Sequence, residues 1–218
     1  MSEHWQLAFV GDSALAVRVL DESPLDANAR VHVLADAVRA AAIVGVRDVV
    51  PGMRDLVVHL DPRRCDVGLV ERALARAATS AIPTSTPSAT SEFVVTFGGA
   101  AGPDLDDVAR ACGLPAADVV RRLTRADLVV HFVGFLPGFP YLGPLDAGLR
   151  LPRRQTPRAC VPAGSVAIAG EYVGIYPWES PGGWHLVGRT DGALFDPARV
   201  PPAVLAPGMR VRLVDADA

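Results

Sequence analysis

The chain has no lysine, since all 21 of its basic residues are arginine. A Walker A phosphate loop, a Schiff-base lysine and the strand lysine of a protein kinase are therefore excluded, because each of them requires an ammonium group. Any anion that this chain binds must meet arginine side chains, helix N-termini or backbone N–H groups.

Long apolar runs and basic runs are also missing, and the first residues do not lead us to expect a leader segment. No apolar run approaches the roughly 20 residues that a membrane-spanning helix needs. The formal net charge is −3 and no basic run occurs, so the chain lacks the electrostatic signature of nucleic-acid binding. The N-terminus carries no basic segment before its apolar stretch, which is unlike a signal peptide. We therefore expect a cytoplasmic protein that binds neither membranes nor nucleic acids.

Cysteine is scarce, and its positions do not suggest a disulfide or a metal site. Cys65, Cys112 and Cys160 lie far apart among apolar neighbours, so we expect buried free thiols in a reducing compartment. The five histidines contain no HxH or HxxxH pattern, and we expect no metal site from them.

Glycine and proline, by contrast, are concentrated in one part of the chain. Between His131 and Gly192, eleven glycines and eight prolines make up nineteen of sixty-two residues, where average usage of about 12% would give about seven. Phenylalanine, tyrosine and tryptophan are interleaved with them, which argues against disorder. This density predicts a shaped surface made largely of backbone.

The N-terminal part has the pattern of a small mixed domain. Residues 5–20 alternate between apolar and polar, which predicts two paired strands. A helix follows with Ser23 as its N-cap, then strands over Val46–Val50 and Asp55–Leu60, then a helix capped by Asp66. The order ββαββα predicts a two-layer α/β domain over residues 1–80.

Residues 81–91 belong to a stretch of Ser, Thr and Pro without charge, which predicts a linker. A surface loop within one domain is the alternative. Residues 92–218 then alternate short strands with Gly/Pro turns, which predicts a closed or nearly closed β-barrel. Asp104 is the expected cap of a helix that ends at Gly113. The expected strands are Glu92–Phe97, Leu128–Val133, Ser165–Ala169, Val173–Tyr176, Trp184–Arg189 and Met209–Val214.

The segment GFLPGFPYLG, Gly134–Gly143, lacks the spacing of a dinucleotide-binding loop. Its prolines fix turns beneath which aromatic rings can pack, so it is a structured loop or a binding loop. His131, just before it, either lines a pocket or faces solvent. The candidate ligand-binding residues of this segment are Gly134, Phe135, Pro137, Gly138 and Phe139.

Two further segments offer groups for an anion. Pro152–Val166 carries Arg153, Arg154 and Arg158 on a proline-stiffened backbone, which suits a carboxylate or phosphate unless these cations form a solvated face. In Ser180–Thr190, two glycines can aim successive N–H groups at an anion as a nest, or form a hairpin turn with a buried tryptophan. The candidate binding residues of the second segment are Ser180, Gly182, Gly183, Trp184 and Arg189.

Several motifs together resemble one family: GGAAGPDL, GFLPGFPYLG, PRRQTPR with VPAGSV, YPWESPGGW, and GRT with LFDPAR and PG. With GDSAL and DVVPG in the N-terminal part, they resemble the family of 5-oxoprolinase B subunits, also called allophanate hydrolase subunit 1 or KipI-like. The resemblance covers essentially the full chain. It implies an α+β protein with a small N-terminal α/β domain and a C-terminal cyclophilin-like β-barrel.

The resemblance also implies partners and a cofactor. Together with the C subunit of the same system and a third subunit, such chains open 5-oxoproline to glutamate using ATP, which with Mg²⁺ would bind only in the complex. Two alternatives stay open, a module that binds and inhibits a histidine kinase and a carboxyltransferase component of urea or allophanate metabolism. The latter needs a separate biotin carrier, because this chain has no lysine to biotinylate.

Residue roles follow from the resemblance as hypotheses. Arg158, Ser165 and His131 are the candidate catalytic residues, and arginines beside a glycine nest suit the activation of a lactam by phosphate. The chain departs from the family pattern at Leu123, Tyr172 and Val173, where polar residues are expected. If these three positions line the site, the substrate differs or the chain is a binding paralogue.

Overall fold

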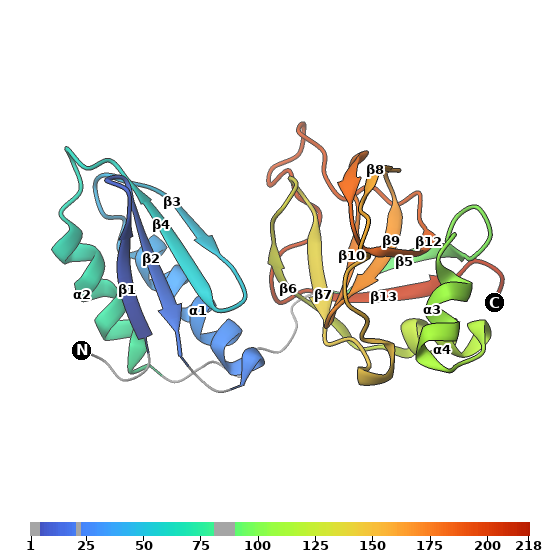
Figure 1. The fold of residues 1–218 in the computed structure, drawn as a ribbon. Coiled ribbons are helices and arrows are strands. Elements are labelled where there is room, and N and C mark those ends of the chain that lie inside the picture. Colours follow the sequence, from blue (N-terminus) through green and yellow to red (C-terminus); the bar gives the residue numbers. More distant parts are fainter. Residues whose placement is uncertain (1–4, 21–22, 81–89) are drawn as a thin grey trace. The chain divides into compact units, whose positions relative to one another are not determined.

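The computed structural model describes residues 5–20, 23–80 and 90–218. The chain divides into two compact units, Met1–Thr84 and Ser85–Ala218 (Figure 1). Most of the predicted linker, 81–89, lies outside the described residues. Its last two residues, Thr90 and Ser91, already belong to the first strand of the second unit.

The N-terminal unit is a four-stranded antiparallel sheet in the order β1-β2-β4-β3, with two helices packed on it. Ser23 accepts a hydrogen bond from the Asp26 N–H at 3.4 Å, and Asp66 accepts one from the Gly68 N–H at 2.9 Å, so both predicted caps are confirmed. Leu15 and Leu56 lie in the core between sheet and helices. The elements are β1 (Trp5–Val10), β2 (Ala14–Val19), α1 (Pro24–Ala40), β3 (Val46–Pro51), β4 (Asp55–Leu60) and α2 (Val67–Ala78).

The second unit is a closed barrel in the order β10-β7-β6-β13-β5-β12-β9, which confirms the predicted fold class. Two short strands, β8 and β11, pair separately as a ribbon. The elements are β5 (Thr90–Phe97), α3 (Leu105–Cys112), α4 (Ala116–Arg125), β6 (Leu128–Val133), β7 (Pro140–Gly143), η1 (Ala147–Leu149), β8 (Arg158–Val161), β9 (Ser165–Ala169), β10 (Tyr172–Ile175), β11 (Ser180–Gly182), β12 (His185–Arg189) and β13 (Arg210–Asp215).

Helices α3 and α4 pack beside one another and against β12 and β13 (Figure 1). Gly113 ends α3 in the left-handed conformation, with φ at 66°, as expected for a glycine after a helix. Among the described residues, no helix is long and apolar enough to cross a membrane.

Strand β9 is buried on both faces and lies between two hydrophobic cores, the barrel interior and an outer cluster. Val166 and Ile168 point into the barrel interior. Ala167 and Ala169 belong to a second, outer cluster that contains Phe139, Tyr176 and Trp184. Because alternate residues of a strand face opposite sides, small side chains on the outer face of β9 leave room for large rings.

The expectation of three buried cysteines is wrong for one of them. Cys65 and Cys112 are partly buried, but Cys160 is exposed. Cys160 lies on β8, in the outer ribbon, where its thiol donates a hydrogen bond to Glu179 that raises the pKa of the thiol. Its neighbour Val161 is buried instead, because alternate residues of a strand face opposite sides, and the apolar character of the segment does not reveal which residue faces inward.

Candidate functional site

The Gly/Pro-rich segments converge on one pocket of about 240 Å³ on the outer side of the barrel wall. Three stretches of sequence supply its lining: the β6–β7 loop with β7, the arginine segment before β8, and the segment from Tyr176 to Trp184. The lining residues are Phe135, Phe139, Tyr141, Arg153, Pro157, Tyr176, Pro181, Gly182, Gly183 and Trp184.

Aromatic rings packed edge to face form the walls of this pocket. The ring of Phe139 lies 5.1 Å from that of Tyr176 and 5.6 Å from that of Trp184, and Tyr141 lies 5.6 Å from Trp184, all measured between centroids. These separations are typical of favourable aromatic pairs. Phe139, Tyr176 and Trp184 are buried, so their positions are fixed by packing.

Close packing of these rings depends on Gly174 in β10. A Cβ atom at this position would lie 2.5 Å from Cζ of Phe139 and 2.9 Å from Cζ3 of Trp184. Both distances are far below van der Waals contact, and neither buried ring has space to withdraw. Only glycine therefore lets both rings rest on the barrel wall.

Phe135 stands at the rim of the pocket in a strained conformation. It is the centre of a three-residue turn in which the Leu136 N–H donates to the Gly134 carbonyl at 2.9 Å. Its φ is 69°, in the left-handed region that bulky residues avoid. The side chain is 60% exposed, with its ring 5.5 Å from that of Phe139. Strain of this kind concentrates at ligand-binding sites.

We expect Phe135→Gly to be more stable than Phe135→Ala by about 1 kcal/mol, because glycine adopts positive φ without a steric penalty. Both variants remove the ring, so the difference isolates the backbone strain. Urea unfolding of the two variants measures it. Equal stability of the two would show that the turn is unstrained.

Arg153 and two tyrosines supply the polar groups of the pocket. Of the described residues that line it, Arg153 alone is charged, and it has no ion pair or hydrogen bond with the described part of the chain. Burial raises the pKa of Tyr141, and this effect outweighs the charge of Arg153, which lowers the same pKa. Burial also raises the pKa of Tyr176, whose hydroxyl accepts the Trp184 N–H. Both phenols therefore stay protonated at neutral pH and can donate a hydrogen bond.

The other two predicted arginines are held by a buried carboxylate. Arg158 donates to both oxygens of Asp104, at 2.9 Å from Nη1 to Oδ2 and 2.7 Å from Nη2 to Oδ1. Arg154 Nη1 donates to Oδ1 at 2.8 Å, and the Leu186 N–H donates to Oδ2 at 2.7 Å. We call Asp104, Arg154 and Arg158 the arginine clamp. It ties the arginine segment to the start of α3 and to β12.

The electrostatics of the arginine clamp follow from this geometry. Burial raises the pKa of Asp104, but the hydrogen bonds from Arg158 and Leu186 and the charges of both arginines outweigh burial, so this pKa lies below its ordinary value. Asp104 is thus ionised at neutral pH and compensates one of the two positive charges. Arg154 and Arg158 act mainly as structural cations rather than as open anion ligands.

Other predicted site residues lie away from the pocket lining. Ser165 is buried at the start of β9, and Arg189 is exposed at the end of β12. His131 is buried on β6, with its ring 6.3 Å from that of Tyr172. Ser180 is buried in β11. Gly134, Pro137 and Gly138 shape the β6–β7 loop without lining the pocket.

The predicted glycine nest is not found, and of the alternative, a hairpin turn with a buried tryptophan, only the burial of Trp184 is confirmed. Gly182 belongs to β11 and pairs with Arg158 of β8, and the Gly183 carbonyl accepts the Arg154 N–H at 2.8 Å. Neither glycine has a positive φ, whereas a nest needs a left-handed residue. The glycines instead allow a close approach, since a Cβ at Gly182 would lie 2.4 Å from the Tyr176 hydroxyl oxygen.

The departures from the family pattern bear little on this pocket. Leu123 and Val173 are fully buried in the barrel core, so they pack against other core residues and do not line the pocket. Tyr172 stacks edge to face on Tyr141, with centroids 5.7 Å apart, behind the pocket wall.

Sequence reasoning missed Asp104 as a site residue, because its position predicts a helix cap. Its side chain makes no capping hydrogen bond, since the carboxylate is engaged by the arginines. Tyr141 and Tyr176 were also missed as lining residues. Their position between Gly/Pro turns was the available signal, because binding residues often lie in loops that a rigid scaffold holds in place.

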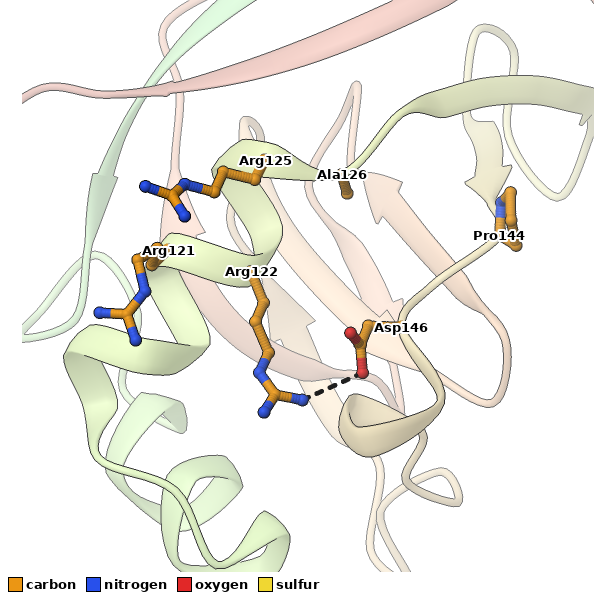
Figure 2. Close-up of a pocket in the computed structure, with 6 residues that line it drawn as sticks. All are labelled: Arg121, Arg122, Arg125, Ala126, Pro144 and Asp146. Atoms are coloured by element: carbon orange, nitrogen blue, oxygen red, sulfur yellow. Dashed lines mark hydrogen bonds and ion pairs between the residues drawn. The ribbon is translucent and has the colours of Figure 1, made fainter.

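A second cavity, of about 330 Å³, lies at the end of α4 and is lined by Arg121, Arg122, Arg125, Ala126, Pro144 and Asp146 (Figure 2). Arg122 reaches toward Asp146 and pairs with it at 3.1 Å, while the guanidinium groups of Arg121 and Arg125 point away (Figure 2). Arg121 pairs with Asp118 at 2.6 Å. These exposed ion pairs are typical of a solvated surface, and none of the candidate residues lies here.

Comparison with known proteins identifies relatives over nearly the whole chain. A family model described as carboxyltransferase domain, subdomain C and D, matches residues 5–205. The chain is 41% identical over 206 residues to the 5-oxoprolinase B subunit of Escherichia coli O157:H7, covering 94% of this chain and 93% of that protein. It is 35% identical over 228 residues to the 5-oxoprolinase B subunit of Bacillus subtilis (strain 168), covering 98% and 94%. The crystal structure of TTHA0988 is similar with a TM-score of 0.81 and 37% identity, covering 94% of this chain and 40% of that longer chain.

Proposed function

The chain belongs to the carboxyltransferase-domain family, subdomains C and D, and from this premise we propose that it is the B subunit of an ATP-dependent 5-oxoprolinase. Family membership, predicted from the motifs, is confirmed. The observation that carries the proposal is the 41% identity to a 5-oxoprolinase B subunit over 94% of this chain. Three motifs of that resemblance, GFLPGFPYLG, PRRQTPR and YPWESPGGW, line one pocket, which supports the same conclusion.

The proposed enzyme is heteromeric and contains the C subunit of the same system and a third subunit. The pocket of about 240 Å³ lies below the range of roughly 300–1,000 Å³ that is typical of sites for drug-sized ligands. It suits a small substrate, or one end of a larger one. The chain has no lysine, and two of the three clustered arginines are engaged by Asp104.

These residues do not by themselves form a site for ATP. One uncommitted arginine and two neutral phenols cannot balance a triphosphate, which normally needs several cations or a metal ion. In the proposed complex, the other two proteins therefore supply most of the groups that bind ATP and Mg²⁺. This chain contributes a pre-formed pocket beside them.

Reconstitution tests the proposal directly. The chain is purified with the C subunit and the third subunit from the same genome, and glutamate release from 5-oxoproline is measured with and without ATP. We expect ATP-dependent glutamate release that requires all three proteins. No release from the complete set would contradict the proposal. Carboxyl transfer from biotin on a separate carrier would instead favour the carboxyltransferase alternative.

We expect Arg158→Ala to lower turnover of the reconstituted complex by about 100-fold, because it loosens the segment that carries Arg153 and Pro157, and small displacements of positioned groups cost about this much. Arg158→Lys keeps the charge but cannot bind both carboxylate oxygens, so it should recover only part of the activity. Circular dichroism verifies that both variants fold. Unchanged turnover of Arg158→Ala would remove the arginine clamp from the site.

A further inference from the structure

We propose that the pocket binds the substrate 5-oxoproline itself, with Arg153 pairing with its carboxylate and the ring held between Phe135, Tyr141 and Trp184. This inference rests on the proposed function and deepens it, because it assigns substrate recognition to this chain rather than to a partner. It also distinguishes Arg153 from the two neighbouring arginines.

The charge of the pocket selects a single negative charge. Arg153 is exposed on the lining, while Arg154 and Arg158 both donate hydrogen bonds to the one carboxylate of Asp104, at 2.7–2.9 Å, and are held outside the lining. No carboxylate lines the pocket among the described residues, so nothing there repels an anion. A planar guanidinium that is not yet paired matches a carboxylate with two parallel hydrogen bonds.

The walls of the pocket select a small flat ring. Phe135, Phe139, Tyr141, Tyr176 and Trp184 form the walls of a pocket of about 240 Å³, which a compact ring can fill. Aromatic side chains can hold a compact ring by van der Waals contact, so the ring itself needs no further polar partner. The substrate is a five-membered lactam with one carboxylate, so its size, shape and charge agree with the pocket.

Two neutral hydroxyl groups complete the recognition of the lactam. Burial raises the pKa of both Tyr141 and Tyr176 and so keeps them protonated, and the Tyr176 oxygen already accepts the Trp184 N–H. The Tyr176 proton is therefore free to point into the pocket. A lactam carbonyl is a strong acceptor, and burying it requires such a donor.

Arg153→Gln tests the proposal in the reconstituted complex. A hydrogen-bonded pair with a charged group accounts for a change of about 10- to 100-fold in affinity, so KM for 5-oxoproline should rise by that factor. KM for ATP should not change, and kcat at saturating substrate should fall far less than kcat/KM. The matched control is Arg110→Gln, at a 75% exposed arginine side chain on α3, and it should behave as the wild type. An unchanged KM for 5-oxoproline in Arg153→Gln would overturn the proposal.

Direct titration of the full chain separates this inference from the proposed function. Calorimetry measures the affinity of wild type and of Arg153→Gln for 5-oxoproline, for its neutral carboxamide and for inorganic phosphate. We expect the two proteins to differ in their affinity for 5-oxoproline, which carries the carboxylate, and not in their affinity for the other two ligands. If the complex releases no glutamate but the chain still binds 5-oxoproline through Arg153, only the enzymatic role fails. If the complex is active and neither binding nor KM depends on Arg153, the substrate site lies elsewhere. Binding of phosphate in preference to 5-oxoproline would also overturn the proposal.

Discussion

Replacing Asp104 by asparagine is expected to lower the free energy of unfolding of the barrel unit by about 3 kcal/mol, near the lower end of the range for breaking a buried ion pair. The side chain of Asp104 is 3% exposed, while those of Arg154 and Arg158 are 31% and 24% exposed. Asparagine keeps the shape but leaves two arginines without a counter-charge. Because the arginines are partly solvated, the loss stays below that of a fully buried pair. Urea unfolding at pH 7 measures it.

The stabilities of the wild type and of Asp104→Asn should depend differently on pH. The pKa of Asp104 is lowered in the folded state, so its stabilisation is present above the ordinary aspartate pKa of about 3.9 and is lost as the pH falls through the lower folded value. The difference between wild type and Asp104→Asn should therefore be constant from about pH 5 to 7 and shrink below about pH 4. A difference that persists unchanged in acid would show that the carboxylate charge is not the cause.

Asp107→Asn is the matched control for this substitution. Asp107 lies on α3, pairs with Arg110 three residues later and has a 62% exposed side chain. Exposed pairs of this kind contribute about 0.3–0.5 kcal/mol. A large effect of Asp107→Asn would mean that any loss of charge near α3 destabilises the barrel. The destabilisation by Asp104→Asn could then not be attributed to the arginine clamp.

Gly182→Ala is expected to destabilise the protein by about 1–3 kcal/mol, as overpacking does in a filled interior, and to abolish measurable turnover of the complex. The new Cβ would lie 2.4 Å from the Tyr176 hydroxyl oxygen and 2.9 Å from Cζ of the same ring. Tyr176 is 1% exposed and cannot retreat without displacing Phe139. Thermal unfolding and glutamate release measure the two effects.

Gly183→Ala is the matched control for stability, because its Cβ would lie 3.6 Å from Cγ of Pro157, an ordinary contact. It should unfold at nearly the wild-type temperature. Adding Tyr176→Phe to Gly182→Ala removes the atom in closest contact and should recover part of the lost stability, as a double-mutant cycle would reveal. Equal stability of the two alanine variants would show that Tyr176 adjusts and that Gly182 is not required for packing.

Much of the fold could be predicted because its signals are local. The caps at Ser23 and Asp66 and the end of α3 at Gly113 each depend on a few neighbouring residues. Strands β7, β8 and β11 were missed, since they are three or four residues long and most of them are rich in Pro and Gly. They exist because the barrel wall or a partner strand supplies their hydrogen bonds, and no local pattern records that.

The sequence by itself determined the family, the α+β class and the segments that line the candidate pocket, because long irregular motifs and local hydrogen-bonding preferences can be recognised along the chain. The tertiary structure alone decided how the charges are shared. Asp104 meets Arg154 and Arg158 across 50 and 54 residues of sequence and leaves Arg153 to the pocket. Such pairing depends on how distant segments meet in the closed barrel, and residue spacing along the chain does not specify it.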